Sequence, residues 1–314
     1  MSHSIDVNFF PGWTRKSISF SIDDGHIETD RKLLDIVSPY GIKGTFNLCS
    51  DRLTELSPEE YREFYRGHEI ANHVKYHPGP FTDGVSYDIS DEPFDPELSD
   101  RSKLYRFEEM EGVFYAQRKK GGWLKLATNE AYVRCIEECH RELEELFGKG
   151  SVRCFIWPYG EQKNEWLRSY IKNIPGYYGT RLSHVGLTPD VYFAPPSREA
   201  FYVSAWHTSL LSVAERFENL PDDGKLKFLC FGVHSIDFEL HGKWDDLVTF
   251  AKTYGARPDD YYYATVGDIF DYSEATKRVK ITDTEIKNPT DVDLYVTVDG
   301  ERLLLKAGKT ILLD

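Results

Sequence analysis

Residues 16–25 read KSISFSIDDG, and this stretch determines the predicted fold class. Residues 16–22 predict a buried strand, and Asp23, Asp24 and Gly25 follow it directly. Further along, a predicted helix over 29–40 precedes a strand over 42–48, and a short strand leads into residues 69–73. Alternating strands and helices predict an α/β protein with a mostly parallel sheet, whose polar site lies at the carboxyl ends of the strands.

The alternation pauses once and then resumes. Residues 79–126, rich in Pro, Gly, Asp and aromatic residues, predict a long irregular insertion, either a functional loop or a plain surface excursion. After it we expect helices over 128–147, 244–254 and 266–272 and strands over 152–157 and 226–233. From residue 275 to 314, short apolar runs and a hairpin signal at Asp299-Gly300 predict a small β appendage after a main domain spanning 1–274.

Composition restricts the partners of the chain. The formal charge of −14 over 314 residues argues against nucleic acid and anionic membranes, and no apolar run reaches the ~20 residues of a membrane helix. We find no signal-peptide pattern and therefore expect a cytoplasmic protein. Five cysteines form no disulfide framework, and Cys135 and Cys139, four apart on a predicted helix, favour reduced thiols.

Two short motifs carry metal and acid–base chemistry. Adjacent acids at a strand end point to different environments, so one of Asp23 and Asp24 could bind a metal while the other serves as a base. His73 and His77 are four residues apart and share one face if this segment is helical. Two histidines and one carboxylate suit Zn²⁺ and neighbouring transition metals. An N-cap with a spare acid, or a chance histidine spacing, is the alternative for each motif taken alone, and His68, His26 and His241 are possible substitute ligands.

Two later motifs complete the predicted site. An apolar strand meets Pro158-Tyr159-Gly160, a tight turn that could offer a backbone N–H to a developing oxyanion. His234 follows a strongly apolar strand, where it could act as a general acid or could be an ordinary core histidine.

In combination these motifs resemble the polysaccharide deacetylase family, carbohydrate esterase family four, also called the NodB-homology domain. SIDDG at 21–25 matches its first motif, and GHEIANHVKYHP at 67–78 matches its second, with Val74 where Thr or Ser is usual. WPYG at 157–160 and His234 with Asp237 resemble the later motifs. The resemblance covers residues 16–270, interrupted by the insertion.

The resemblance implies a distorted (β/α) barrel of about seven strands and the removal of acetyl groups from a sugar. It implies one divalent metal ion held by Asp24, His73 and His77: Zn²⁺ foremost, with Co²⁺, Ni²⁺ or Mn²⁺ as alternatives. A metal-bound water would be the nucleophile, with Asp23 as base and His234 as acid. Tyr159, next to Pro158, would lend its N–H to the oxyanion.

The chain departs from the family pattern in two places. Ile156 stands where the family often has the Arg that orients the base, and Arg153 lies too early in the strand to replace it. The Asp-x-x-Asp-Trp stretch that pairs with the catalytic histidine is missing, leaving Asp190 or Glu199 as candidates. An N-acetyl sugar or oligosaccharide is the favoured substrate. The alternatives are an O-acetyl esterase of the xylan type, a relative acting on a non-sugar amide, and a barrel that binds glycans without catalysis.

Overall fold

Strand β2 (Lys16–Asp23) is buried from Ser17 to Asp23 in the computed structural model, which describes residues 3–119, 121–160, 164–174, 177, 180–182, 200–202 and 206–313. Strand β12 (Lys227–His234) runs parallel to β2, with Lys227 opposite Lys16 and His234 opposite Asp23. Strand β13 (Tyr261–Tyr263) pairs with β2 in the same direction. Strand β12 is apolar on both faces, and β2 alternates small serines with Ile and Phe; since both strands are buried along almost their whole length, this is the buried parallel sheet that the sequence predicts.

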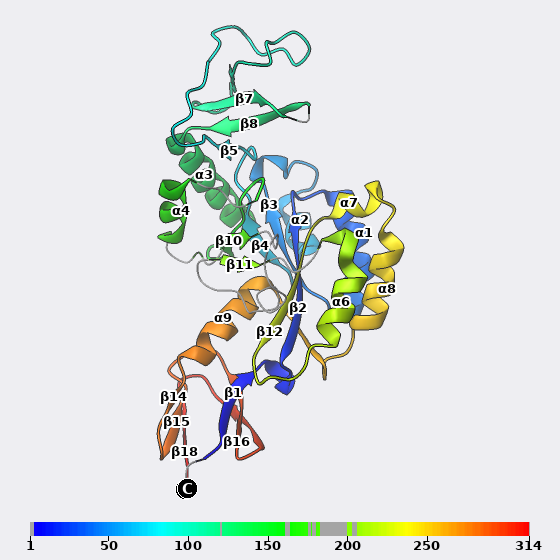
Figure 1. The fold of residues 1–314 in the computed structure, drawn as a ribbon, viewed down its shortest axis with the longest axis vertical. Helices are drawn as coiled ribbons and strands as arrows, with labels where there is room; N and C mark the ends of the chain where they lie inside the picture. The colour runs from blue at the N-terminus through cyan, green and yellow to red at the C-terminus, as the bar shows by residue number, and fades with distance from the viewer. Residues whose placement is uncertain are drawn as a thin grey trace. The chain divides into compact units, whose positions relative to one another are not determined.

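The described chain forms two units, shown by residue number in Figure 1. The first comprises Met1–Phe46, Gly67–Glu69 and Leu182–Asp314, and the second comprises Asn47–Arg66 and Ile70–Arg181. Strand β3 (Gly44–Leu48) begins in the first unit, where it follows β12 and β2 in the sheet order. Strands β4 (Glu69–Asn72) and β9 (Val152–Phe155) are parallel neighbours in the second unit. The α/β class with a parallel sheet is therefore confirmed, and the closed barrel stays a prediction.

Helices of the first unit pack against β2 and β12. Their bounds are α1 (Ile27–Val37), α6 (Leu210–Glu218), α7 (Ser235–Leu240), α8 (Trp244–Tyr254) and α9 (Val266–Lys277), with 3-10 turns at Pro11–Trp13, Ser38–Tyr40 and His207–Ser209. Ser235, the first residue of α7, donates its hydroxyl hydrogen to the buried Asp30 carboxylate of α1 at 2.5 Å. This bond fixes the start of α7, and with it the orientation of the preceding residue, His234.

The C-terminal strands form two small antiparallel sheets. Strand β16 (Leu294–Val298) pairs with β17 (Glu301–Leu305), and Val298 lies opposite Glu301. Asp299 and Gly300 thus form the predicted two-residue turn, both with positive φ. Strand β1 (Ile5–Phe9) also pairs with β16, a contact between the two ends of the sequence that the sequence did not predict. The second sheet contains β14 (Lys280–Ile281), β15 (Glu285–Lys287) and β18 (Thr310–Leu312).

Helix α3 (Asn129–Phe147) is the longest described helix of the second unit. Thr128 caps it by accepting a hydrogen bond from the Ala131 N–H. This unit also contains α2 (Pro58–Phe64), α4 (Glu165–Lys172) and a 3-10 turn at Ser50–Arg52. The short strand β10 (Thr180–Leu182) ends at the first residue of the last segment of the first unit, and β11 (Ala200–Tyr202) belongs to the first unit. No helix in the described ranges combines the length and apolar character that a membrane span requires.

The insertion is more regular than the sequence predicts. Strands β5 (Gly79–Pro80), β8 (Trp123–Ala127), β7 (Val113–Gln117) and β6 (Tyr105–Arg106) form a four-stranded sheet in that order. The prediction of an irregular segment throughout 79–126 is therefore wrong for this part. The aromatic residues supply a local core: Phe94 stacks on Tyr115 at 3.9 Å between ring centroids, and Phe114 packs with Leu104.

Candidate metal centre and active site

Asp23 and Asp24 occupy the sharp turn that ends β2. Asp23 is the last strand residue and is 2% exposed, whereas Asp24 has a left-handed φ of 79° and Gly25 one of 72°. Asp tolerates this conformation better than most residues, and Gly adopts it without penalty. The chain therefore reverses immediately after Asp23, and the two carboxylates occupy different environments, as the sequence predicts.

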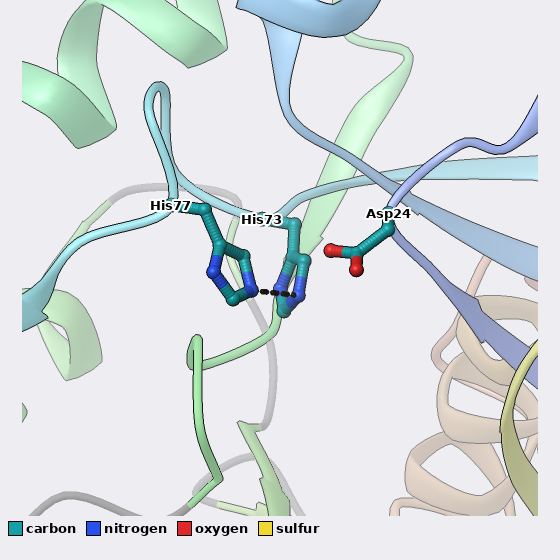
Figure 2. A group of neighbouring side chains, drawn as sticks. All are labelled: Asp24, His73 and His77. Atoms are coloured by element: carbon teal, nitrogen blue, oxygen red, sulfur yellow. Dashed lines mark hydrogen bonds between the residues drawn. The ribbon is translucent and has the colours of Figure 1, made fainter. Parts of the chain in front are cut away.

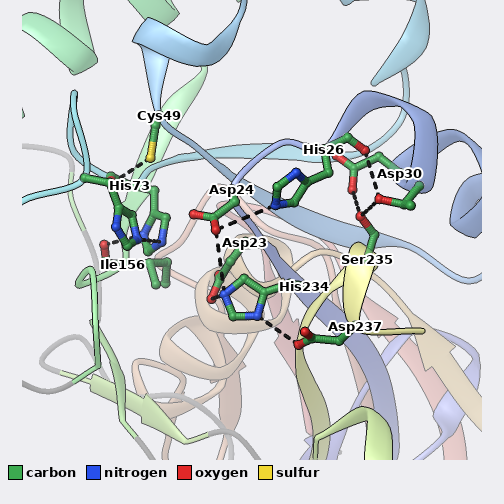
Figure 3. Close-up of polar contacts among 12 residues, drawn as sticks. Asp23, Asp24, His26, Asp30, Cys49, His73, Ile156, His234, Ser235 and Asp237 are labelled. Atoms are coloured by element: carbon green, nitrogen blue, oxygen red, sulfur yellow. Dashed lines mark hydrogen bonds and ion pairs between the residues drawn. The ribbon is translucent and has the colours of Figure 1, made fainter. Parts of the chain in front are cut away.

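His234 ends β12 directly opposite Asp23. Its Nε2 atom lies 3.8 Å from Oδ2 of Asp23 and 3.8 Å from Oδ2 of Asp24. Its Nδ1 atom lies 3.0 Å from Oδ2 of Asp237, in the first turn of α7 (Figure 3). Because a carboxylate accepts hydrogen bonds, Nδ1–H faces Asp237, and Nε2 is directed to Asp23 and Asp24.

Asp237 is the partner of His234 that sequence analysis did not assign. The two candidates named for this role, Asp190 and Glu199, lie outside the described residues. The three-residue spacing of His234 and Asp237 could have indicated this pairing. In the structure His234 is the N-cap of α7, and Asp237 lies in the first turn of that helix. His207 also approaches Asp237, with Nδ1 at 3.6 Å from Oδ2. Burial lowers the pKa of His207, and the Asp237 charge opposes this shift.

The segment from His73 to Pro78 is a loop, not a helix. The condition under which His73 and His77 would share a helical face is therefore not met. Val74, Tyr76 and His77 have φ values of 66°, 66° and 52°, in the left-handed region that non-glycine residues avoid. The two imidazoles nevertheless lie side by side, with ring centroids 4.8 Å apart. Backbone conformation brings them together, not helical periodicity.

Four residues from other elements hold this strained loop in place. The buried Asn72 accepts a hydrogen bond from the Val74 N–H at 2.9 Å, and Asp51 accepts one from the Tyr76 N–H at 2.7 Å. Lys75 lies 3.0 Å from Glu138 and 2.7 Å from Glu142 of α3. Burial works against the charge on Lys75, but hydrogen bonds to these glutamates raise its pKa. Such support is needed because each left-handed residue costs free energy.

Atoms outside the loop determine the tautomer of His73. Its Nδ1 atom lies 2.9 Å from the carbonyl oxygen of Ile156. A carbonyl only accepts hydrogen bonds, so Nδ1 carries the proton and a neutral ring presents an Nε2 lone pair. Nε2 of His77 lies 3.2 Å from Nε2 of His73. Two nitrogens at about 2.0–2.1 Å from a tetrahedral zinc ion are about 3.3 Å apart, so this pair fits a shared ion.

Asp24, His73 and His77 are the group that could hold a metal ion within the part of the chain that the structure describes. One ligand atom from each lies within 4.8 Å of the others. The close-up in Figure 2 shows these three side chains as neighbours. A carboxylate and two imidazoles are donors that suit Zn²⁺, Co²⁺, Ni²⁺ and Mn²⁺. The substitute ligands have other contacts: His68 accepts a hydrogen bond from the Gly44 N–H, and His241 contacts His207. His26 approaches Asp24 at 3.8 Å without joining the group.

Tyr159 lies beside the histidine pair. The residue is 46% exposed, and its ring contacts that of His77 edge-on, with centroids 4.8 Å apart. Pro158 and Gly160 flank it, and both Tyr159 and Gly160 have positive φ, so the predicted tight turn is present. The oxyanion role of the Tyr159 N–H stays a prediction.

The described part of the chain is an α/β protein with carboxylates and imidazoles gathered at the ends of parallel strands. The sequence model for polysaccharide deacetylases matches residues 12–175, and the chain belongs to that family. This family is hydrolytic and includes both peptidoglycan N-deacetylases and acetyl xylan esterases. Among curated proteins, none matches the chain.

Solved structures with a similar fold include three bacterial enzymes. The polysaccharide deacetylase Bc1974 from Bacillus cereus is 14% identical, with a TM-score of 0.44, 80% of this chain and 92% of that chain covered. A family 4 acetyl xylan esterase from Clostridium thermocellum in complex with a cobalt ion is 14% identical, with a TM-score of 0.45 and coverage of 80% and 89%. The peptidoglycan deacetylase PdaC from Bacillus subtilis is 16% identical, with a TM-score of 0.43 and coverage of 84% and 94%.

Proposed function

We propose that this protein is a metal-dependent deacetylase that hydrolyses the N-acetyl amide of an acetylated sugar or oligosaccharide. The observation that carries the proposal is the Asp24, His73 and His77 group, whose donor atoms converge within 4.8 Å. The 3.2 Å separation of the two Nε2 atoms supports a shared divalent ion, with Zn²⁺ the first candidate. When bound, such an ion supplies Lewis-acid chemistry, polarising the acetyl carbonyl and lowering the pKa of a coordinated water.

The protein side chains move the protons of the reaction. Asp23 accepts a proton from the attacking water as its oxygen bonds to the acetyl carbon. His234 donates a proton from Nε2 to the sugar nitrogen as the carbon–nitrogen bond breaks, so acetate and a free amine leave. The Asp237 carboxylate, 3.0 Å from Nδ1, holds the ring in the orientation that this transfer needs. An amine is a poor leaving group unless it is protonated, so this acid suits an amide substrate.

Metal content and acetate release test the proposal together. The purified protein is stripped with a chelator and reconstituted with Zn²⁺, Co²⁺, Ni²⁺ or Mn²⁺. Acetate release is then measured from an N-acetylated oligosaccharide and from an O-acetylated xylan. We expect one ion per chain and metal-dependent release, faster from the N-acetyl substrate. Faster release from the ester would reassign the enzyme as an O-acetyl esterase, and absence of release from both substrates would refute the deacetylase proposal.

A further inference from the structure

The hairpin of the insertion places a cation beside Tyr159, the residue whose ring contacts His77. Strand β7 ends at Gln117 and β8 begins at Trp123, and between them the Arg118 N–H donates to the Gly122 carbonyl at 3.0 Å. From this turn the Arg118 guanidinium lies over the ring of Tyr159, 5.3 Å from its centroid. Tyr159 in turn contacts His77, so one aromatic ring separates Arg118 from a proposed metal ligand.

The hairpin is attached firmly to the histidine loop. Strand β5 begins two residues after His77 and pairs with β8, Gly79 opposite Leu126. Lys125 of β8 lies over the rings of Phe107 and Tyr76, at 4.2 and 5.3 Å, and these two rings contact each other at 4.9 Å. The placement of Arg118 beside Tyr159 therefore follows from strand pairing and packing, not from a freely moving loop (strands labelled in Figure 1).

Arg118 has no carboxylate partner within ion-pair distance among the described residues. It is exposed, in a chain whose formal charge is −14. Arg106, another arginine of the insertion, differs in this respect, because it forms an ion pair with Asp91 at 3.5 Å. A guanidinium stacked on an aromatic face keeps its in-plane N–H donors available, and that planar fork matches a carboxylate. An exposed cation–π contact alone contributes little to stability, so a purely structural role explains this placement poorly.

We propose that Arg118 determines substrate specificity by binding a carboxylate on the acetylated sugar or on its neighbour in the glycan chain. This inference rests on the deacetylase function proposed above and specifies its substrate class as acidic acetylated glycans. The carboxylate belongs either to a hexuronate ring or to a lactyl ether on an N-acetylhexosamine, and both present the same planar anion to the guanidinium. Tyr159 supplies an apolar face for the sugar ring next to that charge.

The test compares kcat/KM for three N-acetylated oligosaccharides of equal length: neutral, hexuronate-containing and lactyl-ether-containing. We expect the wild type to prefer one acidic substrate over the neutral one by about 10- to 100-fold, the contribution of a charge-assisted hydrogen bond pair. In R118Q this ratio should fall to about one, mainly through KM, and R118K should recover only part of it. The matched control is K119Q, which removes the adjacent exposed charge and should preserve the ratio.

The outcomes separate the two proposals. The role of Arg118 is refuted if the wild type releases acetate with equal kcat/KM from all three substrates. It is also refuted if the ratio of kcat/KM for the acidic and neutral substrates is unchanged in R118Q. In both cases the deacetylase proposal is unaffected. An equal loss of the ratio in K119Q also overturns the role of Arg118, because general charge attraction would then be sufficient. No release from any substrate refutes the deacetylase itself, and the Arg118 proposal fails with it. The more strongly preferred acidic substrate identifies the source of the carboxylate.

Discussion

Replacing Asp51 with alanine tests whether the histidine loop is held in a conformation that it would not adopt unaided. Asp51 lies in a 3-10 turn more than twenty residues before the loop, and its Oδ1 accepts the Tyr76 N–H at 2.7 Å. The substitution removes this acceptor and leaves both histidines in the sequence. We expect the pair to lose its convergence, because Tyr76 immediately precedes His77.

The magnitude follows from the strain in the loop. Val74, Tyr76 and His77 each have positive φ, and a left-handed residue costs roughly 1–2 kcal/mol, so the loop stores about 3–6 kcal/mol. A hydrogen bond to a charged acceptor contributes about 1.5–3 kcal/mol, which is a large share of what offsets that strain. Because about 1.4 kcal/mol corresponds to a tenfold change in affinity, we expect zinc affinity to fall about 10- to 100-fold.

Competition with a chromophoric chelator measures that affinity, and thermal unfolding of the metal-free protein provides the structural comparison. D51N is the matched variant, because its amide oxygen still accepts the Tyr76 N–H without the charge. We expect D51N to retain most of the affinity that D51A loses. If D51A binds zinc within about twofold of the wild type, the strain reasoning is wrong. Equal losses in D51A and D51N would instead assign the effect to the charge of Asp51.

Three further predictions concern other residues. D23N should lower acetate release at least about 100-fold while metal content, measured by elemental analysis, stays at the wild-type level; normal rates would exclude Asp23 as the base. D237A should lower kcat about tenfold or more while the amount of bound metal stays unchanged. D237N should restore part of the lost kcat, because its amide oxygen still accepts the Nδ1 hydrogen bond of His234. An unaltered kcat in D237A would show that His234 needs no orienting partner. Burial lowers the pKa of His68 from 6.5 to about 4, so its neutral form should stabilise the fold fully above pH 6.5, with up to about 3 kcal/mol lost as pH falls toward 4. H68N keeps an acceptor for the Gly44 N–H, and the free energy of unfolding is measured for it and for the wild type by denaturant titration at several pH values. Between pH 6.5 and 4 this free energy should fall more steeply with decreasing pH in the wild type than in H68N, and parallel pH dependences would contradict the assignment.

Local sequence patterns predicted the elements that position the site. The apolar run of β12 identifies a buried strand because only a two-sided interior accommodates it, and β2 alternates small serines with Ile and Phe, which also suits a buried strand. The Asp299-Gly300 turn is equally readable, since only a few residue pairs accept two positive φ angles. The pairing of β1 with β16 was not predictable in this way, because nearly the whole sequence separates the two strands. Local periodicity says nothing about such long-range partners.

The supporting contacts of the site escaped prediction for the same reason. The motif at 67–78 predicts His73 and His77 as ligands, but their spacing pointed to a shared face only if the segment were helical, and it has left-handed residues instead. Asp51 could not be connected to this loop from the sequence, because the bond is made by its side chain to a backbone N–H of a distant residue. When a side chain binds a backbone N–H, the residue type of its partner gives no signal in the sequence. Such contacts become visible only in the folded chain.

Two replacements within the family motifs, Ile156 and Val74, occur where this structure uses backbone groups. Ile156 replaces the usual Arg, yet its carbonyl oxygen accepts the His73 Nδ1 hydrogen bond, which any residue at that position could do. Val74 replaces the usual Thr or Ser, and its N–H donates to Asn72 while its side chain is fully buried. Neither replacement therefore removes a contact that orients the histidine pair. It follows that these substitutions should leave metal affinity intact, and that any loss of rate relative to other family members should come from the acid–base residues and not from the metal ligands.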